Sequence, residues 1–397
     1  MTAPDLAADP PPPAHADWQD DILPGFERQL LALPGGETAV LVRRRSAASP
    51  AESRGSAGPP ARSNNPVDDA VRATLTAAAP AAPKPSGHLA DGPPAAAQSG
   101  AHPDKGVPAV GQASAKPAVL YLHGFVDYFF QTHLADAFEA RGYRFYALDL
   151  RGYGRSLEYS TDPERPNYVP DLSVYAQDLD AAARAIAEEE AGRSLVGIGH
   201  STGGLILPLW AAARPRPLRA LALNSPWLDF NGNWFMRGPA TWLVAGLAKI
   251  APKLPISGLK VHYGRALHHE TGGEWVYDLA WKPHDGFPVR PLWFTSVRRW
   301  QARVARGIEV GCPVLVMTSL RRGDPTRHHP EVITTDSILN PRQMWRRAPK
   351  LGLDVEVRAL EGGAHDLALS PEPARSRYLA ETLDWFDRVV APAPRGL

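Results

Sequence analysis

From residue 117 to about residue 390, short apolar runs alternate with amphipathic segments of helical periodicity. The expected strands are AVLYLHG, YRFYALDL, SLVGIG, LRALALNSP, PVLVMTS and DVEVRAL. The expected helices include THLADAFEARG, DLSVYAQDLDAAARAIAEEEAG with Asp171 as its N-cap, and ARSRYLAETLDWFDRVV. Near-continuous apolar strands that alternate with helices are typical of a parallel sheet covered on both faces, so the sequence predicts an α/β fold.

Composition limits the functions open to this chain. Apolar residues make up 44% of its 397 residues, which is enough for a sizeable core. Lys and Arg number 43 against 42 Asp and Glu, so there is no overall basic field to attract nucleic acid. The single cysteine, Cys312, excludes an internal disulfide and is expected to be a small buried apolar residue. We expect no nucleic-acid partner, no metal and no cofactor.

The regular pattern does not extend over the whole chain. Residues 1–25 are predicted to be a flexible N-terminus, and residues 26–46 to form two strands around a Pro-Gly-Gly turn. Residues 47–116 are rich in Pro, Ala, Ser and Gly; they are predicted to be a disordered insertion, because they carry too little apolar surface to offset the entropy of ordering. The chain start lacks the features of a secretory signal, and TWLVAGLAKIAP is too short to span a bilayer. We therefore expect a soluble cytoplasmic protein.

Three predicted strand ends carry residues capable of nucleophilic or acid–base chemistry. Ser201 lies in GIGHSTGG after one strand, His123 and Gly124 end another, and His365 follows the last strand in LEGGAHD. In open parallel sheets, sites form at the carboxyl ends of the strands. The glycines around Ser201 indicate a tight strand-to-helix turn, which can hold a nucleophile at its tip or can be an ordinary connection with a surface serine. The other two strand ends favour the first interpretation.

Four segments carry a family resemblance: YLHGFVDYFFQ, ALDLRGYGRS, GIGHSTGG and EGGAHD. Their order and approximate spacing resemble those of the α/β-hydrolase superfamily, most of all its serine-hydrolase branch of lysophospholipase and monoacylglycerol-lipase type, also described as serine aminopeptidase-like. The resemblance implies an α/β-hydrolase fold with a mostly parallel sheet. Its core would comprise residues 26–46, 117–225 and 312–392, with an inserted, mainly helical cap at residues 226–311.

The resemblance also implies roles for individual residues. Ser201 would be the nucleophile, and because a hydroxyl is weakly nucleophilic at neutral pH it needs a base, which His365 can supply. A carboxylate would hold the imidazole in the correct tautomer. The backbone N–H groups of Phe125 and Thr202 would form the oxyanion hole.

Two aspartates can supply this carboxylate. Asp336 precedes a helix that is expected to begin at Asn340 and Pro341, and it matches the D-x-x-x-[DN] pattern of the resembling family. Asp324, in LRRGDP, lies closer to the preceding strand. We favour Asp336 and keep Asp324 as the alternative; residues 320–335 would then be a loop insertion.

Aromatic residues indicate an apolar pocket. Seven of the eleven tryptophans lie in the predicted cap, and most of them are expected to fill its own core. Tyr128 and Phe129, with Phe130, are the candidates for lining an acyl pocket. His200 and His123 are expected to shape the site rather than to carry a proton. The histidines of LHH and RHH have no accompanying ligand spacing and are expected at the surface rather than in a metal site.

These observations favour a serine hydrolase that cleaves a small-molecule carboxylic ester through an acyl-enzyme, with an apolar acyl group as in lysophospholipase-like and monoacylglycerol-lipase-like enzymes. Amidase or peptidase chemistry with the same triad, or a non-catalytic hydrolase-fold protein that binds a ligand, are the alternatives. Epoxide and haloalkane hydrolysis in this fold use an aspartate nucleophile, so Ser201 argues against both.

Residues 47–116 are predicted to be dispensable, because their composition cannot contribute a packed core. A variant that joins Ser46 to Lys116 through a short Gly/Ser linker should melt cooperatively near the parent temperature and retain ester hydrolysis. Circular dichroism melting and an ester assay measure both properties. An insoluble or inactive variant would contradict the prediction.

Overall fold

The computed structural model describes residues 17–45 and 115–391, except residues 161, 163, 164, 231–238, 257 and 259. All of these belong to one compact unit of the chain, Met1–Arg45 together with Ala113–Leu397. The predicted insertion, residues 47–116, lies outside the described residues except for its last two.

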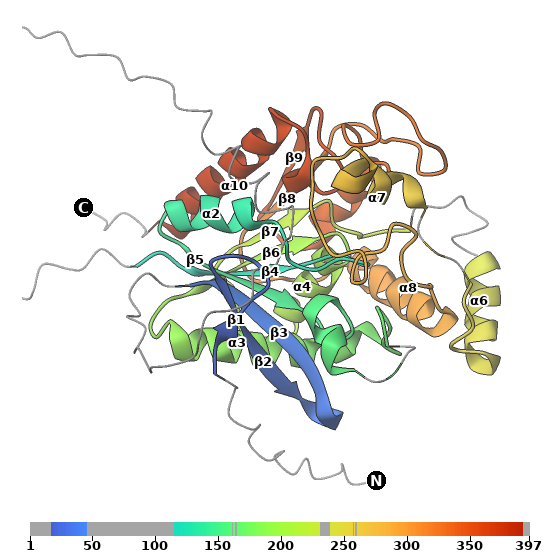
Figure 1. Ribbon diagram of the computed structural model, residues 1–397, viewed down its shortest axis with the longest axis horizontal. Helices are drawn as coiled ribbons and strands as arrows, with labels where there is room; N and C mark the ends of the chain where they lie inside the picture. Colours follow the sequence, from blue (N-terminus) through green and yellow to red (C-terminus); the bar gives the residue numbers. More distant parts are fainter. Residues whose placement is uncertain are drawn as a thin grey trace, which may run out of the picture. The chain divides into compact units, whose positions relative to one another are not determined.

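Within the described residues, nine strands form one sheet in the order β1-β2-β3-β5-β4-β6-β7-β8-β9 (Figure 1). Strands β1, β2, β3 and β5 pair antiparallel in succession, whereas the pairs from β5 through β4 to β9 are parallel. The sheet is thus mostly parallel, as the sequence predicted. The strands are β1 (Gln19–Asp20), β2 (Phe26–Leu33), β3 (Glu37–Arg44), β4 (Ala118–Leu122), β5 (Arg144–Asp149), β6 (Leu195–His200), β7 (Leu221–Asn224), β8 (Val314–Ser319) and β9 (Val355–Leu360).

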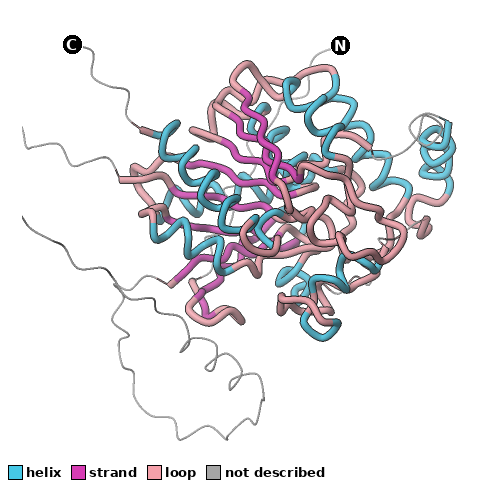
Figure 2. Tube along the Cα trace, turned by 90° about the horizontal axis from the view of Figure 1, so that it is seen from above, coloured by secondary structure: helices cyan, strands magenta, loops and turns pink. Residues whose placement is uncertain are grey.

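Helices cover both faces of the sheet (Figures 1 and 2). Helices α2 and α10 pack on one face, and α3, α4 and α8 contribute to the core on the other. No described helix combines the length and the apolar character needed to cross a bilayer. The helices are α2 (Thr132–Ala140), α3 (Tyr175–Glu189), α4 (Gly203–Ala212), α6 (Pro239–Ile250), α7 (Val261–Leu267), α8 (Pro291–Ala305), α9 (Pro341–Arg347) and α10 (Ala374–Val390).

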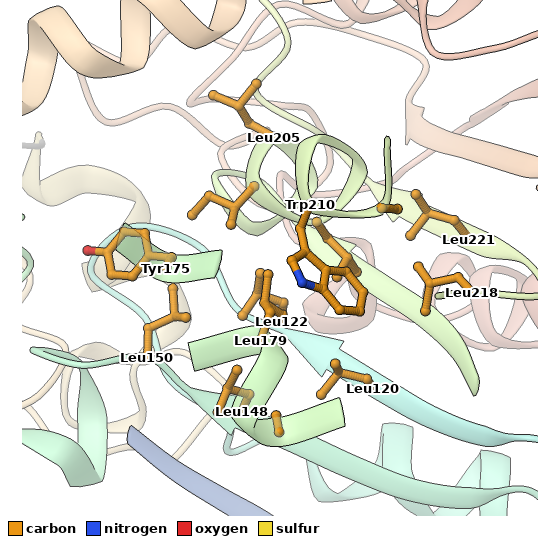
Figure 3. Close-up of a cluster of buried hydrophobic side chains, with 14 of the residues drawn as sticks. Leu120, Leu122, Leu148, Leu150, Tyr175, Leu179, Leu205, Trp210, Leu218 and Leu221 are labelled. Atoms are coloured by element: carbon orange, nitrogen blue, oxygen red, sulfur yellow. The ribbon is translucent and has the colours of Figure 1, made fainter. Parts of the chain in front are cut away.

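Strand β4 explains why the predicted strands are continuous apolar runs. Leu120 and Leu122 pack into the apolar cluster on the face of the sheet covered by α3 and α4. Trp210 belongs to the same cluster (Figure 3). The alternate residues, Val119 and Tyr121, pack on the opposite face beneath α2 and α10. Because successive side chains of a strand point to opposite faces and both faces are covered, every residue of β4 is buried. The predicted α/β architecture is confirmed.

Regular structure begins closer to the N-terminus than the sequence predicted. Strand β1 pairs with β2, and both carboxylate oxygens of Asp21 accept hydrogen bonds from Arg155, at 2.6 and 2.8 Å. Arg155 also pairs with Asp149 at 2.8 Å, and all three side chains are fully buried. The flexible N-terminus predicted over residues 1–25 is therefore wrong from residue 19 onward. A two-residue strand shows no periodicity, and the partner of Asp21 is remote in sequence.

The segment between β7 and β8 contains α6, α7 and α8, joined by irregular chain. Helix α8 contacts α4, and its Trp293, Val297 and Val304 belong to the main core. Helix α6 packs against α8 instead and leaves Trp242 81% exposed. The part of the predicted cap that includes α8 therefore belongs to the layer that covers the sheet.

Exposed polar or charged residues lie at both edges of the described sheet. Strand β1 consists of two exposed residues, Gln19 and Asp20. At the opposite edge, Glu356 on β9 forms ion pairs with Arg358 on the same strand and with Arg388 on α10.

Replacing Arg155 with methionine should lower the free energy of unfolding by about 3–5 kcal/mol, because the carboxylates of Asp21 and Asp149 would remain buried without their partner. Urea denaturation followed by circular dichroism measures the change. The matched control is Arg28→Met, which removes a partly exposed pair with Glu158 and should cost less than about 1 kcal/mol. Equal losses at the two arginines would contradict the prediction.

Candidate active site

The turn from β6 to α4 holds Ser201 in a left-handed backbone conformation. The φ angle of Ser201 is 52°, which a non-glycine residue rarely adopts. A Cβ atom on Gly203 would lie 2.5 Å from the carbonyl oxygen of Leu122, and one on Gly199 would lie 2.8 Å from that of Gly203. Only glycine allows β4, β6 and α4 to approach this closely. The sharp turn therefore presents Ser201 at the carboxyl ends of the parallel strands.

The structure brings Ser201, His365 and Asp336 into one hydrogen-bonded chain. His365 Nε2 lies 3.0 Å from Ser201 Oγ, and His365 Nδ1 lies 3.0 Å from Asp336 Oδ1. The three residues come from loops after β6, β9 and β8, and their exposed fractions are 8%, 4% and 0%. A carboxylate on Nδ1 fixes the tautomer in which Nε2 can accept a proton from the hydroxyl.

Asp336 is held by backbone groups as well as by His365. Its Oδ1 accepts hydrogen bonds from Leu339 N at 2.7 Å and from Ile338 N at 3.0 Å. Burial acts to raise the pKa of Asp336, but His365 and the two backbone N–H groups outweigh this effect and keep its pKa below the ordinary value. Asp336 is therefore ionised at neutral pH. Helix α9 follows, with Asn340 as its N-cap and Pro341 at its first position, as predicted.

The alternative acid, Asp324, lies away from His365. Its side chain is 38% exposed, pairs with Arg327 and accepts hydrogen bonds from Thr326. The loop between β8 and Asp336 folds back on itself: Asp336 N donates to Arg321 O, and Gly323 N donates to Asp336 O. Of the two candidates, geometry brings only Asp336 to the imidazole.

Phe125 and Thr202 lie in the wall of the cavity that contains Ser201 and His365. In the described part of the chain, neither backbone N–H has a hydrogen-bond acceptor. On both sides of Phe125 the backbone is engaged, because Val126 N donates to Asn167 Oδ1 at 2.6 Å and Gly124 N lies 3.5 Å from Asp127 Oδ2. Two free donors beside the hydroxyl are the arrangement that an oxyanion hole requires.

A cavity of about 530 Å³ opens beside Ser201. One set of lining residues is apolar and comes mainly from the segment between β7 and β8. A second set is polar and comes from the oxyanion loop, the nucleophile turn and the same segment between β7 and β8. The apolar residues include Trp227, Phe230, Val244, Ile256, Val289, Trp293 and Phe294; the polar ones include Asp127, His200, Lys260, Tyr263, Lys282 and His284.

Tyr128 and Phe129 do not line this cavity, which corrects the expectation from the sequence. Tyr128 packs edge-on against Trp281 with ring centroids 5.1 Å apart, and its hydroxyl accepts from Asp278 N. Phe129 is buried on the face of the sheet covered by α2 and α10, against Tyr121. These contacts hold both side chains inside the protein, and Phe125 and Trp293 line the cavity instead.

A buried polar cluster lies next to Ser201. Ligand atoms of Asp127, His200 and Asp366 come within 4.8 Å of one another, as in a metal site. However, Lys282 Nζ lies 2.5 Å from Asp127 Oδ1, so an ammonium group already neutralises this carboxylate. Burial lowers the pKa of His200, which favours its neutral form. The donor set therefore fits a lysine better than a metal ion.

The sequence interpretation missed Asp127 and Lys282. The position of Asp127, two residues after Phe125 in HGFVD, could have indicated that it lies near the site. Lys282, in AWKPHD, lies 155 positions from Asp127, and no motif in the sequence indicates that the two are in contact. The expectation that the LHH histidines lie at the surface is wrong for His268, which is 1% exposed with its Nε2 3.1 Å from Tyr277 O.

Comparison with known proteins defines the family. Residues 113–319, more than half of the chain, match the family described as Serine aminopeptidase, S33. The chain therefore belongs to this family of α/β-hydrolase enzymes, as its motifs predicted.

Curated relatives match over shorter stretches. The monoacylglycerol lipase of Mycolicibacterium smegmatis is 30% identical over 145 residues, which are 36% of this chain and 48% of that protein. Bifunctional epoxide hydrolase 2 of Sus scrofa is 34% identical over 119 residues, which are 30% of this chain and 20% of that protein. The chain thus matches about half of the first relative's length and less of the second.

Solved structures share the fold. A soluble variant of monoglyceride lipase from Saccharomyces cerevisiae has 18% identity and a TM-score of 0.50, and covers 70% of this chain and 88% of its own. Monoacylglycerol lipase from Paleococcus ferrophilus has 19% identity and a TM-score of 0.50, and covers 69% of this chain and 96% of its own. The predicted α/β-hydrolase fold is confirmed.

Proposed function

We propose that this protein is a serine hydrolase that cleaves carboxylic esters through an acyl-enzyme on Ser201. The observation that carries the proposal is the buried hydrogen-bonded chain from Ser201 through His365 to Asp336, which opens on a cavity. Two unengaged backbone N–H groups beside it, from Phe125 and Thr202, complete the set of groups that acyl transfer needs.

Acylation follows from these positions. His365 Nε2 accepts the hydroxyl proton as Ser201 Oγ attacks the ester carbonyl carbon, and the π electrons of the carbonyl move to its oxygen. Phe125 and Thr202 donate hydrogen bonds to this oxyanion. The imidazolium, stabilised by Asp336, then protonates the leaving alkoxide as the C–O bond breaks, and an alcohol departs.

Deacylation repeats the sequence with water. His365 Nε2 removes a proton from a water molecule, whose oxygen attacks the acyl carbon. The second tetrahedral intermediate uses the same two N–H donors. Its collapse breaks the bond to Ser201 Oγ, which takes the proton back from His365, and a carboxylic acid is released.

The lining of the cavity supports an apolar acyl group. Apolar side chains from the segment between β7 and β8, such as Val244, Ile256 and Phe294, line it together with polar side chains that include Asp127 and Lys282. An ester with an apolar acyl chain and a polar alcohol fits such a mixed lining. The description of the Mycolicibacterium smegmatis relative as a monoacylglycerol lipase agrees with this substrate class.

Two alternatives rest on weaker support. Amide cleavage would use the same triad, and a non-catalytic binding protein would use the same cavity. The second alternative leaves the hydrogen-bonded chain and the unengaged N–H groups without a role. The epoxide hydrolase likeness does not transfer its reaction, because Ser201 stands where that chemistry needs an aspartate.

A fluorophosphonate probe should label the wild-type protein and leave Ser201→Ala unlabelled, because the probe reacts only with an activated hydroxyl. The same variant should lose turnover on a panel of p-nitrophenyl esters of graded acyl length, on which the wild type should prefer medium or long chains. Gel fluorescence and absorbance measure the two effects. Equal labelling of both proteins would refute Ser201 as the nucleophile, and unlabelled wild type would favour the binding-protein alternative.

Asp336→Asn should lower turnover by about four orders of magnitude if the effect resembles that in serine proteases, because the imidazole would lose the anionic partner on Nδ1. The matched control, Asp324→Asn, changes an exposed carboxylate on the same loop and should leave kcat within about tenfold. Steady-state kinetics on one ester decide between them. A large loss at Asp324 with normal turnover for the Asp336 variant would reverse the assignment.

A further inference from the structure

A buried ion pair connects the oxyanion loop to the segment between β7 and β8. Lys282 Nζ lies 2.5 Å from Asp127 Oδ1 and 3.5 Å from the carbonyl oxygen of Val126. The side chains of Lys282 and Asp127 are 14% and 2% exposed. A pair this buried is sensitive to the loss of one partner, because the remaining charge would stay desolvated.

The contact falls next to a strained residue. Val126 has a φ angle of 53°, and for a β-branched side chain this left-handed conformation is a genuine outlier. Such strain persists only where the surroundings hold it. Both backbone polar groups of Val126 have partners: its N–H donates to Asn167 Oδ1 at 2.6 Å, and its carbonyl oxygen lies 3.5 Å from Lys282 Nζ. The preceding residue is Phe125, whose N–H is one of the two proposed oxyanion-hole donors.

Aromatic contacts support the same two segments without depending on the charge. Tyr277 packs against Phe130 with ring centroids 5.1 Å apart, and Trp281 packs against Tyr128 at the same separation. These rings belong to one buried cluster. Removing the ammonium group should therefore leave the segments in contact and release only the polar end of the interface, at Val126 and Asp127.

We infer that Lys282 is a positioning residue, which through Asp127 and Val126 holds the N–H of Phe125 in the direction that the oxyanion requires. This inference rests on the proposed function. Lys282 makes no covalent change during the reaction; it fixes a donor before the substrate arrives, and its effect falls on the transition state rather than on substrate binding.

The charges around Asp127 agree with this role. Burial acts to raise the pKa of Asp127, but the ammonium group of Lys282 outweighs this effect and keeps the pKa below its ordinary value. Asp127 is therefore the ionised partner that Lys282 needs. Asp366, the other carboxylate of the cluster, is engaged by Asn224 and Gln131.

The test compares full-length Lys282→Met, Lys282→Arg, Asp127→Asn and the Lys282→Met/Asp127→Asn double variant with wild type. Lys282→Met should lower kcat by about a hundredfold with KM within about threefold, since a small displacement of a catalytic group has this cost. Binding of a trifluoromethyl ketone, which forms a tetrahedral adduct on the serine, should weaken by the same factor as kcat/KM. Lys282→Arg should retain most of kcat.

The double variant separates positioning from folding or substrate contact. It should be no slower than the slower single variant, because both changes remove one interaction. Lys350→Met, at an exposed lysine far along the chain, should leave kcat unchanged, and thermal melting should show that the variants remain folded. If Lys282→Met fails to fold, Asp127→Asn tests the same ion pair and should likewise lower kcat with little change in KM.

Distinct outcomes overturn the inference and the proposed function. Wild-type kcat in Lys282→Met, or a raised KM with unchanged kcat, would overturn the positioning role while leaving the serine hydrolase intact. Losses in kcat that multiply in the double variant would also overturn the positioning role, because they would show that the two residues act independently. A wild-type protein that neither turns over esters nor reacts with fluorophosphonate would instead overturn the proposed function and this inference with it.

Discussion

The close approach of backbone around Gly203 is the constraint on which the candidate site depends. A side chain there would meet the carbonyl oxygen of Leu122, so the start of α4 can rest against the end of β4 only with glycine at this position. This contact brings the turn that carries Ser201 beside the loop that carries Phe125. The proposed nucleophile and the two proposed N–H donors thus share one rigid origin, the carboxyl edge of the parallel strands.

The other candidate catalytic residues reach this edge of the sheet from distant parts of the sequence. His365 reaches Ser201 from the loop after β9, and Asp336 reaches His365 from the loop after β8. Each loop is fixed locally: backbone N–H groups bind Asp336, and Asn224 binds the carboxylate of Asp366, next to His365. The hydrogen-bonded chain is therefore supported on both sides rather than by its own two hydrogen bonds alone.

The fold could be predicted from the sequence because its signals are local, and the candidate site residues because their motifs resemble those of a known family. Continuous apolar strands indicated a sheet covered on both faces, and the helix start at Asn340 indicated which aspartate lies near His365. The direction of Tyr128 could not be predicted, since its ring packs against Trp281 in a distant part of the sequence. Ion pairs such as Asp21–Arg155 and Asp127–Lys282 join residues more than 130 positions apart, and no periodicity marks them.

The residues at the edges of the sheet bear on how readily another chain could pair with it. A row of unpaired backbone groups at a sheet edge can template a strand from another chain, which is a route to fibrils and precipitates. Here one edge ends in a strand of two residues, and the other carries the charged network of Glu356, Arg358 and Arg388. Very short edge strands and charged side chains on an edge strand both disfavour the addition of a strand from another chain.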